Sequence, residues 1–221
     1  MFVFDSIIFG YNDKLILRGV YLSISINSIV GLFGFNGCGK STLIKIGAGF
    51  LTQNDGNIFI DEVVVENNYS INRYNSLGYL SQDSFIPKDI TVWEFLKISN
   101  SSHNNLIDDP IIKKIINQKI ISLSGGELRY LEIIFLFSLD RKYYLLDEPF
   151  TGIEPLYIEK IIDLIQKEKQ KGKGILLTDH YHHYVTDIID KCYLMKAGYI
   201  TELDKTNNYR EELLNNGYLA K

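Results

Sequence analysis

An eight-residue stretch near the N-terminus constrains this chain more than any other feature. Its sequence, Gly34-Phe35-Asn36-Gly37-Cys38-Gly39-Lys40-Ser41, fits the pattern G-x-x-x-x-G-K-[ST]. An apolar run precedes it at residues 29–33, and a helix-like stretch follows at residues 41–50. Glycines let several backbone N–H groups face one anion, and the start of a helix adds partial positive charge. The pattern therefore predicts a phosphate-binding loop between a strand and a helix, and the flanking elements argue against a chance glycine-rich turn.

In such a loop, two side chains carry separate tasks. Lys40 is expected to reach the β- and γ-phosphates of a nucleotide as a point charge. The hydroxyl of Ser41 is expected to hold Mg²⁺. The stretch therefore predicts a nucleoside triphosphate as the ligand.

Composition limits what kind of protein surrounds this loop. The 221 residues, 46% hydrophobic and 23% charged, predict a folded globular protein of one large domain or two small ones. With 23 basic and 27 acidic side chains the net charge is −4, which argues against a general nucleic-acid binder. Cys38 and Cys192 are the only cysteines, and they lack the spacing of metal ligands, which predicts a reducing, cytosolic compartment.

Nothing in the sequence has the character of a membrane anchor. The first residues lack the basic and small-residue features of a signal peptide. The longest apolar runs, such as residues 133–137, are far shorter than the roughly 20 residues that cross a bilayer. A role at a membrane would therefore need a partner that spans it.

The first part of the chain has mainly strand patterns. Alternating or continuous apolar residues predict strands at residues 2–9, 15–17, 21–26, 29–33 and 78–81 and a hairpin at 57–65 turning at Asp61-Glu62. From residue 91 to 117 the pattern becomes helical. Thr91 and Glu94 form a capping box before a helix at 92–98, a polar loop follows at 99–105, and Asp109-Pro110 starts another helix.

The second half alternates between strands and helices. Helices are expected at 124–139, 155–171 and 207–217, and strands at 143–146, 174–178, 192–195 and 199–203, the last two as a hairpin. This alternation predicts an α/β fold with a mainly parallel sheet covered by helices. We find no internal repeat and no low-complexity linker.

Two further motifs suit a nucleotide-hydrolysing enzyme. Asp147-Glu148-Pro149 ends a buried apolar strand, where an Asp can hold Mg²⁺ and the following Glu can polarise water. Ser124-Gly125-Gly126-Glu127 starts a helix and predicts a second anion site. A plain strand-end turn and an ordinary N-cap are the structural alternatives. Because the phosphate-binding loop already holds one end of the nucleotide, the second site suggests a partner subunit that presents it to the same ATP.

Three single residues indicate a role at the nucleotide only in combination with these motifs. His180 follows the apolar strand at 174–178 and can donate a hydrogen bond to the γ-phosphate, whereas His182 and His183 are expected on the surface. Gln82 follows the strand at 78–81 and can coordinate or sense Mg²⁺. Tyr11 can stack on an adenine ring, although it is one of fifteen tyrosines.

These motifs, in this order, resemble the ATP-binding cassette (ABC) family over essentially the whole chain. The resemblance implies a P-loop NTPase (RecA-like) core with an antiparallel β subdomain, at residues 1–82 and 124–221, and a short helical subdomain at residues 83–123. It implies two cassettes that pack head to tail and sandwich each ATP between the phosphate-binding loop of one copy and residues 124–127 of the other. Within this framework the nucleotide contacts are Tyr11, Gly34, Phe35, Asn36, Gly37, Cys38, Gly39, Lys40, Ser41 and Thr42 in one copy and Ser124, Gly125, Gly126 and Glu127 in the other.

The resemblance also assigns catalytic and metal-binding roles. Ser41, Gln82 and Asp147 would bind Mg²⁺, with Gln82 linking the metal to a membrane partner. Glu148, His180 and Lys40 would be catalytic. The motifs around Asp147 and His180 are similar to those of cassettes for lipopolysaccharide export and branched-chain amino-acid import.

Several positions depart from the family pattern. Glu154 stands where an Asp is usual, and Tyr130 and Phe135 stand where basic residues are common. The stretch between Gln82 and residue 123 is shorter than in most relatives. These departures concern coupling to a transporter, because every residue expected at the nucleotide site is present.

The leading hypothesis is a Mg²⁺-dependent ATPase subunit of a membrane transporter, bound to the inner face of a bacterial cell membrane. Its expected partners are a second cassette, in a homodimer or in a dimer with a related cassette, and an integral membrane subunit, with no nucleic acid. A soluble, nucleotide-gated interaction module that acts on ribosomes or DNA is the alternative, although such proteins usually carry two cassettes or long basic insertions. A small-molecule kinase would leave residues 124–127 without a purpose.

Overall fold

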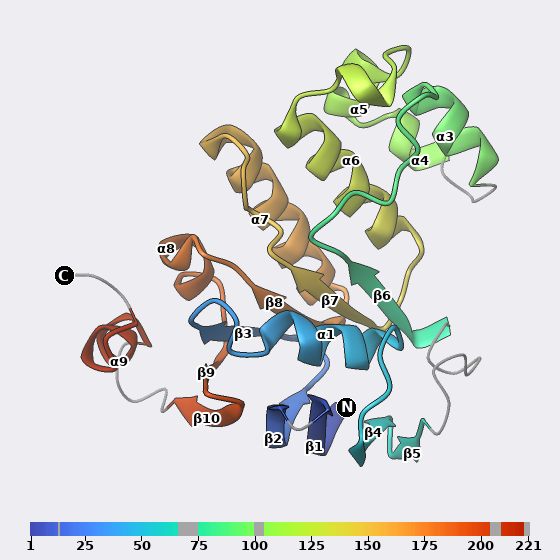
Figure 1. Ribbon diagram of the computed structural model, residues 1–221. Helices are drawn as coiled ribbons and strands as arrows, with labels where there is room; N and C mark the ends of the chain where they lie inside the picture. The colour runs from blue at the N-terminus through green and yellow to red at the C-terminus, as the bar shows by residue number, and fades with distance from the viewer. Residues whose placement is uncertain (13, 66–74, 100–103, 204–208, 219–221) are drawn as a thin grey trace.

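The computed structural model describes residues 1–12, 14–65, 75–99, 104–203 and 209–218. Two sheets lie on either side of helix α1 (Lys40–Ala48), as Figure 1 shows. The larger has six strands in the order β10-β9-β3-β8-β7-β6, and the smaller has four in the order β2-β1-β4-β5. All neighbours in the larger sheet pair in parallel except β9 and β10. The predicted α/β class, with a mainly parallel sheet and an antiparallel β subdomain, is therefore confirmed.

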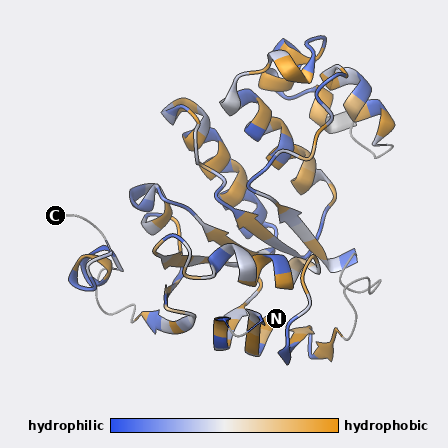
Figure 2. Ribbon diagram, in the orientation of Figure 1, coloured by the Kyte–Doolittle hydropathy of each residue, from blue (hydrophilic) through white to orange (hydrophobic). Residues whose placement is uncertain are grey.

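The strands of the larger sheet come from distant parts of the chain. They are β3 (Ser28–Gly34), β6 (Leu77–Leu80), β7 (Tyr143–Asp147), β8 (Gly174–Thr178), β9 (Lys191–Lys196) and β10 (Tyr199–Leu203). β7 and β8 are buried along their whole length, as expected for parallel strands covered on both faces. The central strands β7 and β8 consist mainly of hydrophobic residues, whereas the edge strand β10 is partly hydrophilic in Figure 2, because most of its residues are exposed.

The smaller sheet is antiparallel and contains β1 (Phe2–Tyr11), β2 (Lys14–Ile24), β4 (Asp55–Ile60) and β5 (Val63–Val64). The two strands predicted at 15–17 and 21–26 form one strand, β2. Asp61 and Glu62 turn the predicted hairpin with φ angles of 51° and 70°, the left-handed values that such a turn requires. The Asp61 carboxylate accepts hydrogen bonds from Lys142 and Tyr143, which fixes this unusual turn pair.

Helices cover the larger sheet on both faces. Besides α1, they are α6 (Gly125–Ser138), α7 (Pro155–Gln170), α8 (His182–Thr186) and α9 (Tyr209–Asn215). One apolar cluster joins α1 to the smaller sheet and one face of the larger sheet. A second cluster joins α6 and α7 to the opposite face. The helix predicted at 207–217 is found as α9, and residues 207 and 208 lie outside the described part of the chain.

The helical segment predicted after residue 91 projects from the core beside α6, at the upper right of Figure 1. It contains α3 (Val92–Ile98), α4 (Asn104–Ile107), α5 (Pro110–Ile115) and a 3₁₀ turn, η1 (Ile120–Ser122). The capping box of Thr91 and Glu94 is present, and Asp109 caps α5. The prediction of a polar loop at 99–105 is wrong at its end, because residues 104 and 105 begin α4. Residues 100–103 of that loop lie outside the described ranges.

Candidate nucleotide-binding site

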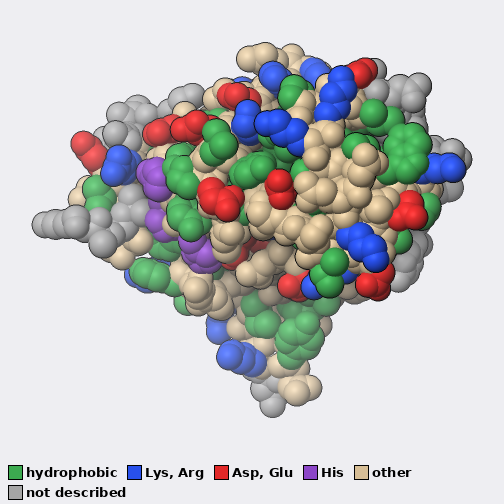
Figure 3. All heavy atoms as spheres, turned by 90° about the horizontal axis from the view of Figure 1, so that it is seen from above, with side chains coloured by type: hydrophobic (Ala, Val, Ile, Leu, Met, Phe, Trp, Pro, Cys, Tyr) green, Lys and Arg blue, Asp and Glu red, His purple; other side chains and the backbone are tan. Residues whose placement is uncertain are grey.

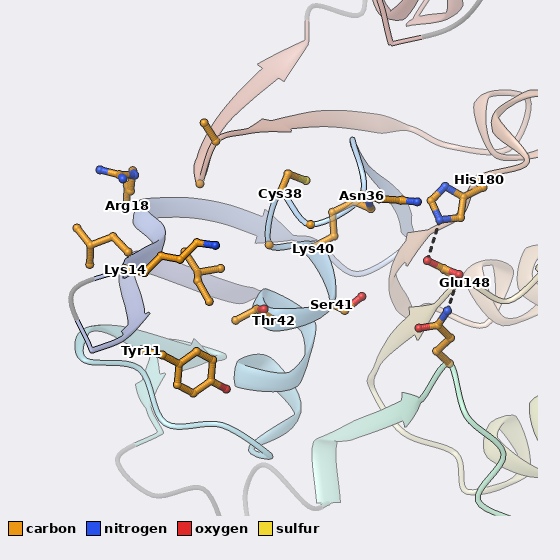
Figure 4. Close-up of a pocket in the computed structure, with 17 residues that line it drawn as sticks. Tyr11, Lys14, Arg18, Asn36, Cys38, Lys40, Ser41, Thr42, Glu148 and His180 are labelled. Atoms are coloured by element: carbon orange, nitrogen blue, oxygen red, sulfur yellow. Dashed lines mark hydrogen bonds and ion pairs between the residues drawn. The ribbon is translucent and has the colours of Figure 1, made fainter.

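The predicted site residues meet at the carboxyl ends of the parallel strands. β3 leads into the glycine-rich loop, β7 ends at Asp147, and β8 ends at Thr178, two residues before His180. Ligands of open α/β sheets bind at this edge. A cavity of about 780 Å³ opens there, within the usual range for small-molecule sites. Figure 4 shows the labelled side chains around it.

The glycine-rich loop has the backbone of an anion cradle. Gly37 and Gly39 have φ angles of 76° and 115°, which side chains other than glycine rarely adopt. Gly39 is the N-cap of α1 and supplies no capping side chain. The first N–H groups of α1 are therefore left for a bound anion. The Lys40 ammonium is buried and donates to the Gly34 carbonyl at 2.6 Å and to the Phe35 carbonyl at 3.4 Å.

A hydrogen-bonded carboxylate lies beside this cradle. Asp147 is 1% exposed, and its Oδ1 accepts from Ser41 at 3.1 Å and from Thr178 at 3.0 Å. Its Oδ2 is buried without a partner among the described residues. Burial raises the pKa of Asp147 above its ordinary value, against the opposing effect of the two hydrogen bonds. A buried carboxylate with an unpaired oxygen next to a serine hydroxyl is a fitting environment for a hard cation.

Glu148 is held between two other predicted site residues. Its Oε1 lies 2.9 Å from His180 Nε2, and its Oε2 accepts from Gln82 Nε2 at 3.1 Å and from Thr151 at 3.3 Å. The first two contacts are the dashed lines in Figure 4. Glu148 has a φ of 53°, a conformation that a non-glycine residue keeps only when its surroundings impose it. The fold thus brings Gln82, Glu148 and His180, from three separate strand ends, to one point.

The other end of the cavity is formed by the smaller sheet and the β9–β10 hairpin. Tyr11 lies there, 57% exposed, with its ring edge-on to Phe9 at 5.0 Å. Sequence reasoning missed six lining residues: Lys14, Leu15, Ile16, Arg18, Ala197 and Gly198. The first four lie three to seven residues after Tyr11, and this proximity in the sequence is the signal that would have found them. The hairpin turn was predicted, but its position against β2, where Arg18 N donates to the Gly198 carbonyl at 2.9 Å, follows from the tertiary structure.

Most of the predicted site residues line this cavity. The nucleotide contacts that do are Tyr11, Asn36, Gly37, Cys38, Gly39, Lys40, Ser41 and Thr42, and the predicted metal-binding and catalytic residues Gln82, Glu148 and His180 line it as well. Gly34 contributes its carbonyl to Lys40, and Asp147 lies next to the cavity through Ser41. Phe35 is 55% exposed, with its ring edge-on to Tyr218.

The segment Ser124-Gly125-Gly126-Glu127, the signature segment below, does not line the cavity of its own chain. Ser124 caps α6 and forms a capping box with Glu127. Gly126 is tightly packed, since a Cβ there would lie 2.5 Å from the Tyr157 ring and 2.8 Å from Glu154 Oε2. Glu154, the unusual residue of the following loop, therefore lies directly against the signature segment.

The histidines near the site differ in their surroundings. In Figure 3 the histidine side chains lie together on one side of the upper face, beside acidic side chains. His183 is exposed as predicted, and His182, which was also predicted on the surface, is half-buried. Its ring packs against Tyr218 at 4.8 Å and Phe33 at 5.7 Å. Burial, together with the neighbouring His180, Lys40 and His183, lowers the pKa of His182 to about 4, so it is neutral at pH 7.

Two departures noted in the sequence have structural explanations. The Tyr130 hydroxyl donates to Asp109 at 2.8 Å and so ties α6 to the cap of α5. The Phe135 ring packs against the Phe95 ring with 4.8 Å between their centroids and a tilt of 58°, which extends the apolar contact between α6 and α3. These aromatic residues join the helical segment to the core where basic residues were expected.

The comparisons with known proteins agree with this geometry. The family model of the ABC transporter matches residues 17–151. The chain belongs to the ABC transporter family. The lipopolysaccharide export system ATP-binding protein LptB of Haemophilus influenzae is 32% identical over 86% of this chain and 85% of its own. An uncharacterised ABC transporter ATP-binding protein of Rhizobium meliloti is 30% identical over 90% of this chain and 78% of its own.

Solved structures of ABC cassettes share the fold. A nucleotide-free cassette from an ABC transporter matches with a TM-score of 0.83 at 23% identity, over 100% of this chain and 99% of its own. A dimeric cassette in a post-hydrolysis state, bound to ADP and phosphate, matches with a TM-score of 0.77 at 20% identity, over 92% and 98%. This ABC protein is therefore an ATP-binding, ATP-hydrolysing subunit that couples energy to a membrane transporter. Family membership leaves the kinase hypothesis without support.

Proposed function

We propose that this ABC ATPase hydrolyses Mg²⁺-ATP in the cavity between the glycine-rich loop and Glu148. The observation that carries the proposal is that an anion cradle and the Gln82–Glu148–His180 cluster line one cavity, with an unpaired buried carboxylate oxygen of Asp147 beside it. Tyr11 at the far end of the cavity would stack on the adenine, and the glycine-rich loop would hold the phosphates.

The residues next to the phosphates fit a magnesium ion. Asp147 Oδ2 has no protein partner in the described chain, the Ser41 hydroxyl lies beside the same carboxylate, and both are oxygen donors. The Gln82 amide donates through Nε2 to Glu148, which leaves its Oε1 as a third oxygen donor. Bound Mg²⁺ would neutralise charge that develops on the β- and γ-phosphates.

The chain's own residues divide the remaining tasks. Glu148, held by His180 and Gln82, would orient and polarise the attacking water once nucleotide has entered. Lys40 lies at the loop carbonyls, from which its ammonium can reach the phosphates. His180 would donate to the γ-phosphate and stabilise the charge of the transition state.

The position of the signature segment supports action as a dimer. Ser124 and Gly125 are exposed, and the segment lies outside the cavity of its own chain. We propose that a second copy, packed head to tail, places this segment on the γ-phosphate, so that Ser124, Gly125, Gly126 and Glu127 act in trans. The exposed helix start supplies the partial positive charge that such a contact needs.

A second cavity supports a membrane partner. It measures about 640 Å³ and has a mainly apolar lining that includes Phe50, Tyr79, Phe85 and Phe135. Phe50 and Phe85 are 70% and 44% exposed, which is costly for a surface without a partner. We propose that a membrane subunit docks here, between the core and the helical subdomain at residues 83–123, next to Gln82. Among the described residues, no helix is long and apolar enough to span a bilayer itself.

We propose that the protein works on the inner face of the cell membrane of a bacterium, without a nucleic-acid partner. The relatives named LptB are ATP-binding proteins of lipopolysaccharide export systems. Co-purification from detergent-solubilised membranes tests the membrane partner. Recovery of a polytopic membrane protein supports the assignment, whereas recovery of ribosomes or DNA would favour the soluble interaction module.

Replacement of Glu148 tests the catalytic assignment. Glu148→Gln should lower kcat at least 100-fold while the Kd for ATP stays within threefold, and ATP should double the molar mass in light scattering. Glu159→Gln, at an exposed position on α7, is the matched control. Full turnover by Glu148→Gln would refute the catalytic role, and a mass unchanged by ATP would refute the dimer.

A further inference from the structure

Arg129 is a buried charged residue that the catalytic assignment does not use. It lies in the second turn of α6, behind the signature segment, and is 7% exposed. Its charge partner is Glu132, 3.1 Å away and 2% exposed. The other carboxylate oxygen of Glu132 is buried without a partner among the described residues, so Glu132 depends on Arg129. Arginine side chains are rarely buried unless they are paired, so the burial of this guanidinium needs a structural or functional explanation.

The remaining hydrogen bonds of Arg129 reach two functional segments. Nη2 donates to the carbonyl of Glu148 at 2.9 Å and to that of Asp147 at 3.2 Å. Nη1 donates to the carbonyl of Ser81, the residue before Gln82, at 2.8 Å. One planar side chain thus joins the signature helix to the backbone beneath both Glu148 and Gln82. The rigid fork of a guanidinium suits such a set of acceptors, and a lysine ammonium does not.

The hydrogen bonds from Arg129 hold the backbone at a strained residue, Glu148. Glu148 has a φ of 53°, and Thr178 holds its N–H through a backbone bond of 3.0 Å. Arg129 holds its carbonyl from the opposite element, so the two flanking peptide groups of Glu148 are fixed from α6 and from β8. The direction of the Glu148 side chain, toward His180 and Gln82, follows from this backbone conformation.

We propose that Arg129 is a positioning residue for hydrolysis. It fixes the Glu148 carboxylate and the start of the Gln82 loop to the helix that carries the signature segment. The inference rests on the proposed function, in which that segment contacts the ATP of the other copy. Occupation of the second ATP site then orients the catalytic carboxylate of the first, through one buried side chain.

The test must separate positioning from folding. Arg129→Lys keeps the charge beside Glu132 but cannot span the three carbonyls. The double variant Arg129→Met, Glu132→Met removes both charges, so that no buried charge is left without its partner. The control is Lys171→Met, Glu168→Met, which removes an ion pair of the same sequence spacing at the C-terminal end of α7. This pair is 2.6 Å apart, with Glu168 buried and Lys171 exposed, and it lies outside the nucleotide cavity.

The expected result is a separation of turnover from binding. Both Arg129 variants should lose at least tenfold in kcat, since small misplacements of a catalytic group have large effects. Their Kd for ADP and for a non-hydrolysable ATP analogue should stay within threefold of the parent, because Arg129 does not line the cavity. The melting temperature of the double variant should match that of the control.

Three other outcomes would each overturn the proposed role of Arg129. Turnover within twofold of the parent in the folded double variant would overturn the inference while leaving the proposed function intact. Equal losses in kcat and in nucleotide affinity would show a merely structural role and overturn it as well. Full turnover in Glu148→Gln would overturn the proposed role of Glu148 and this inference together.

Discussion

The hydroxyl of Thr178 offers a direct measure of the charge on Asp147. Thr178 is fully buried and donates to Asp147 Oδ1 at 3.0 Å. Thr178→Val keeps the shape of the side chain and removes this donor. A hydrogen bond to a charged group contributes about 1.5–3 kcal/mol, so we expect a loss of about 2 kcal/mol at pH 8. With an unfolding entropy of about 2.1 cal/mol/K per residue over 221 residues, this corresponds to a fall in Tm of about 4 °C.

The pH dependence identifies the cause of that loss. Burial already raises the pKa of Asp147 above 3.8, and removal of a donor to the ionised form raises it further. The full loss of stability in Thr178→Val is therefore expected where Asp147 is ionised, at pH values above its raised folded-state pKa. The cost shrinks as the pH falls through that pKa, because the protonated carboxyl depends less on the donor.

Calorimetry of the nucleotide-free protein between pH 8 and pH 4.5 measures this difference. Thr178→Ser is the control, because it keeps the hydroxyl and loses only a methyl group, at a cost of about 1 kcal/mol that does not vary with pH. A fall in Tm that is the same for Thr178→Val at both ends of the range would refute an ionised, desolvated Asp147. A fall below 1 °C at pH 8 would refute the contribution of the hydrogen bond itself.

Two further predictions concern the cavity and the smaller sheet. Tyr11→Ala should raise the KM for ATP about 5- to 150-fold with kcat unchanged, since base stacking contributes about 1–3 kcal/mol, and Tyr11→Phe should stay within twofold. Steady-state kinetics measure both constants, and an unchanged KM would refute the stacking of Tyr11 on the adenine ring. Asp61→Asn should cost at most about 1 kcal/mol at pH 7, because the ion pair with Lys142 is partly exposed. Its hydrogen-bonded carboxylate has a pKa well below the usual range, so the loss should be full above the ordinary pKa of an Asp and should shrink as the pH falls below it. Urea unfolding with a pH-independent difference would contradict the assignment.

Local sequence was sufficient for the elements whose chemistry is local. The glycines of residues 34–41 fix their own backbone, and the capping box at Thr91 was correctly predicted because its partners lie within one turn. The helix start at Ser124 was also predicted, whereas its capping box with Glu127 was found only in the structure. The helix boundary near residue 104 was missed, since short polar stretches carry no periodic signal.

Long-range contacts decided the rest of the site. The strand order places β6, β7 and β8 side by side, although they come from residues 77, 143 and 174 onward, and this brings Gln82, Glu148 and His180 into contact. The same packing places His182 against Phe33 and Tyr218, and it places the β9–β10 hairpin beside β2. No spacing in the sequence encodes these distances.

The sequence by itself determined that this protein binds a nucleotide through a glycine-rich loop. The loop backbone needs glycines and the ligand needs a lysine and a serine, and all of these residues lie at a fixed local spacing. Only the tertiary structure decided which residues complete the cavity and that Arg129 reaches the carbonyls of Glu148 and Ser81. Hydrogen bonds from a buried side chain depend on how helices pack on a sheet, and packing is a property of the whole fold.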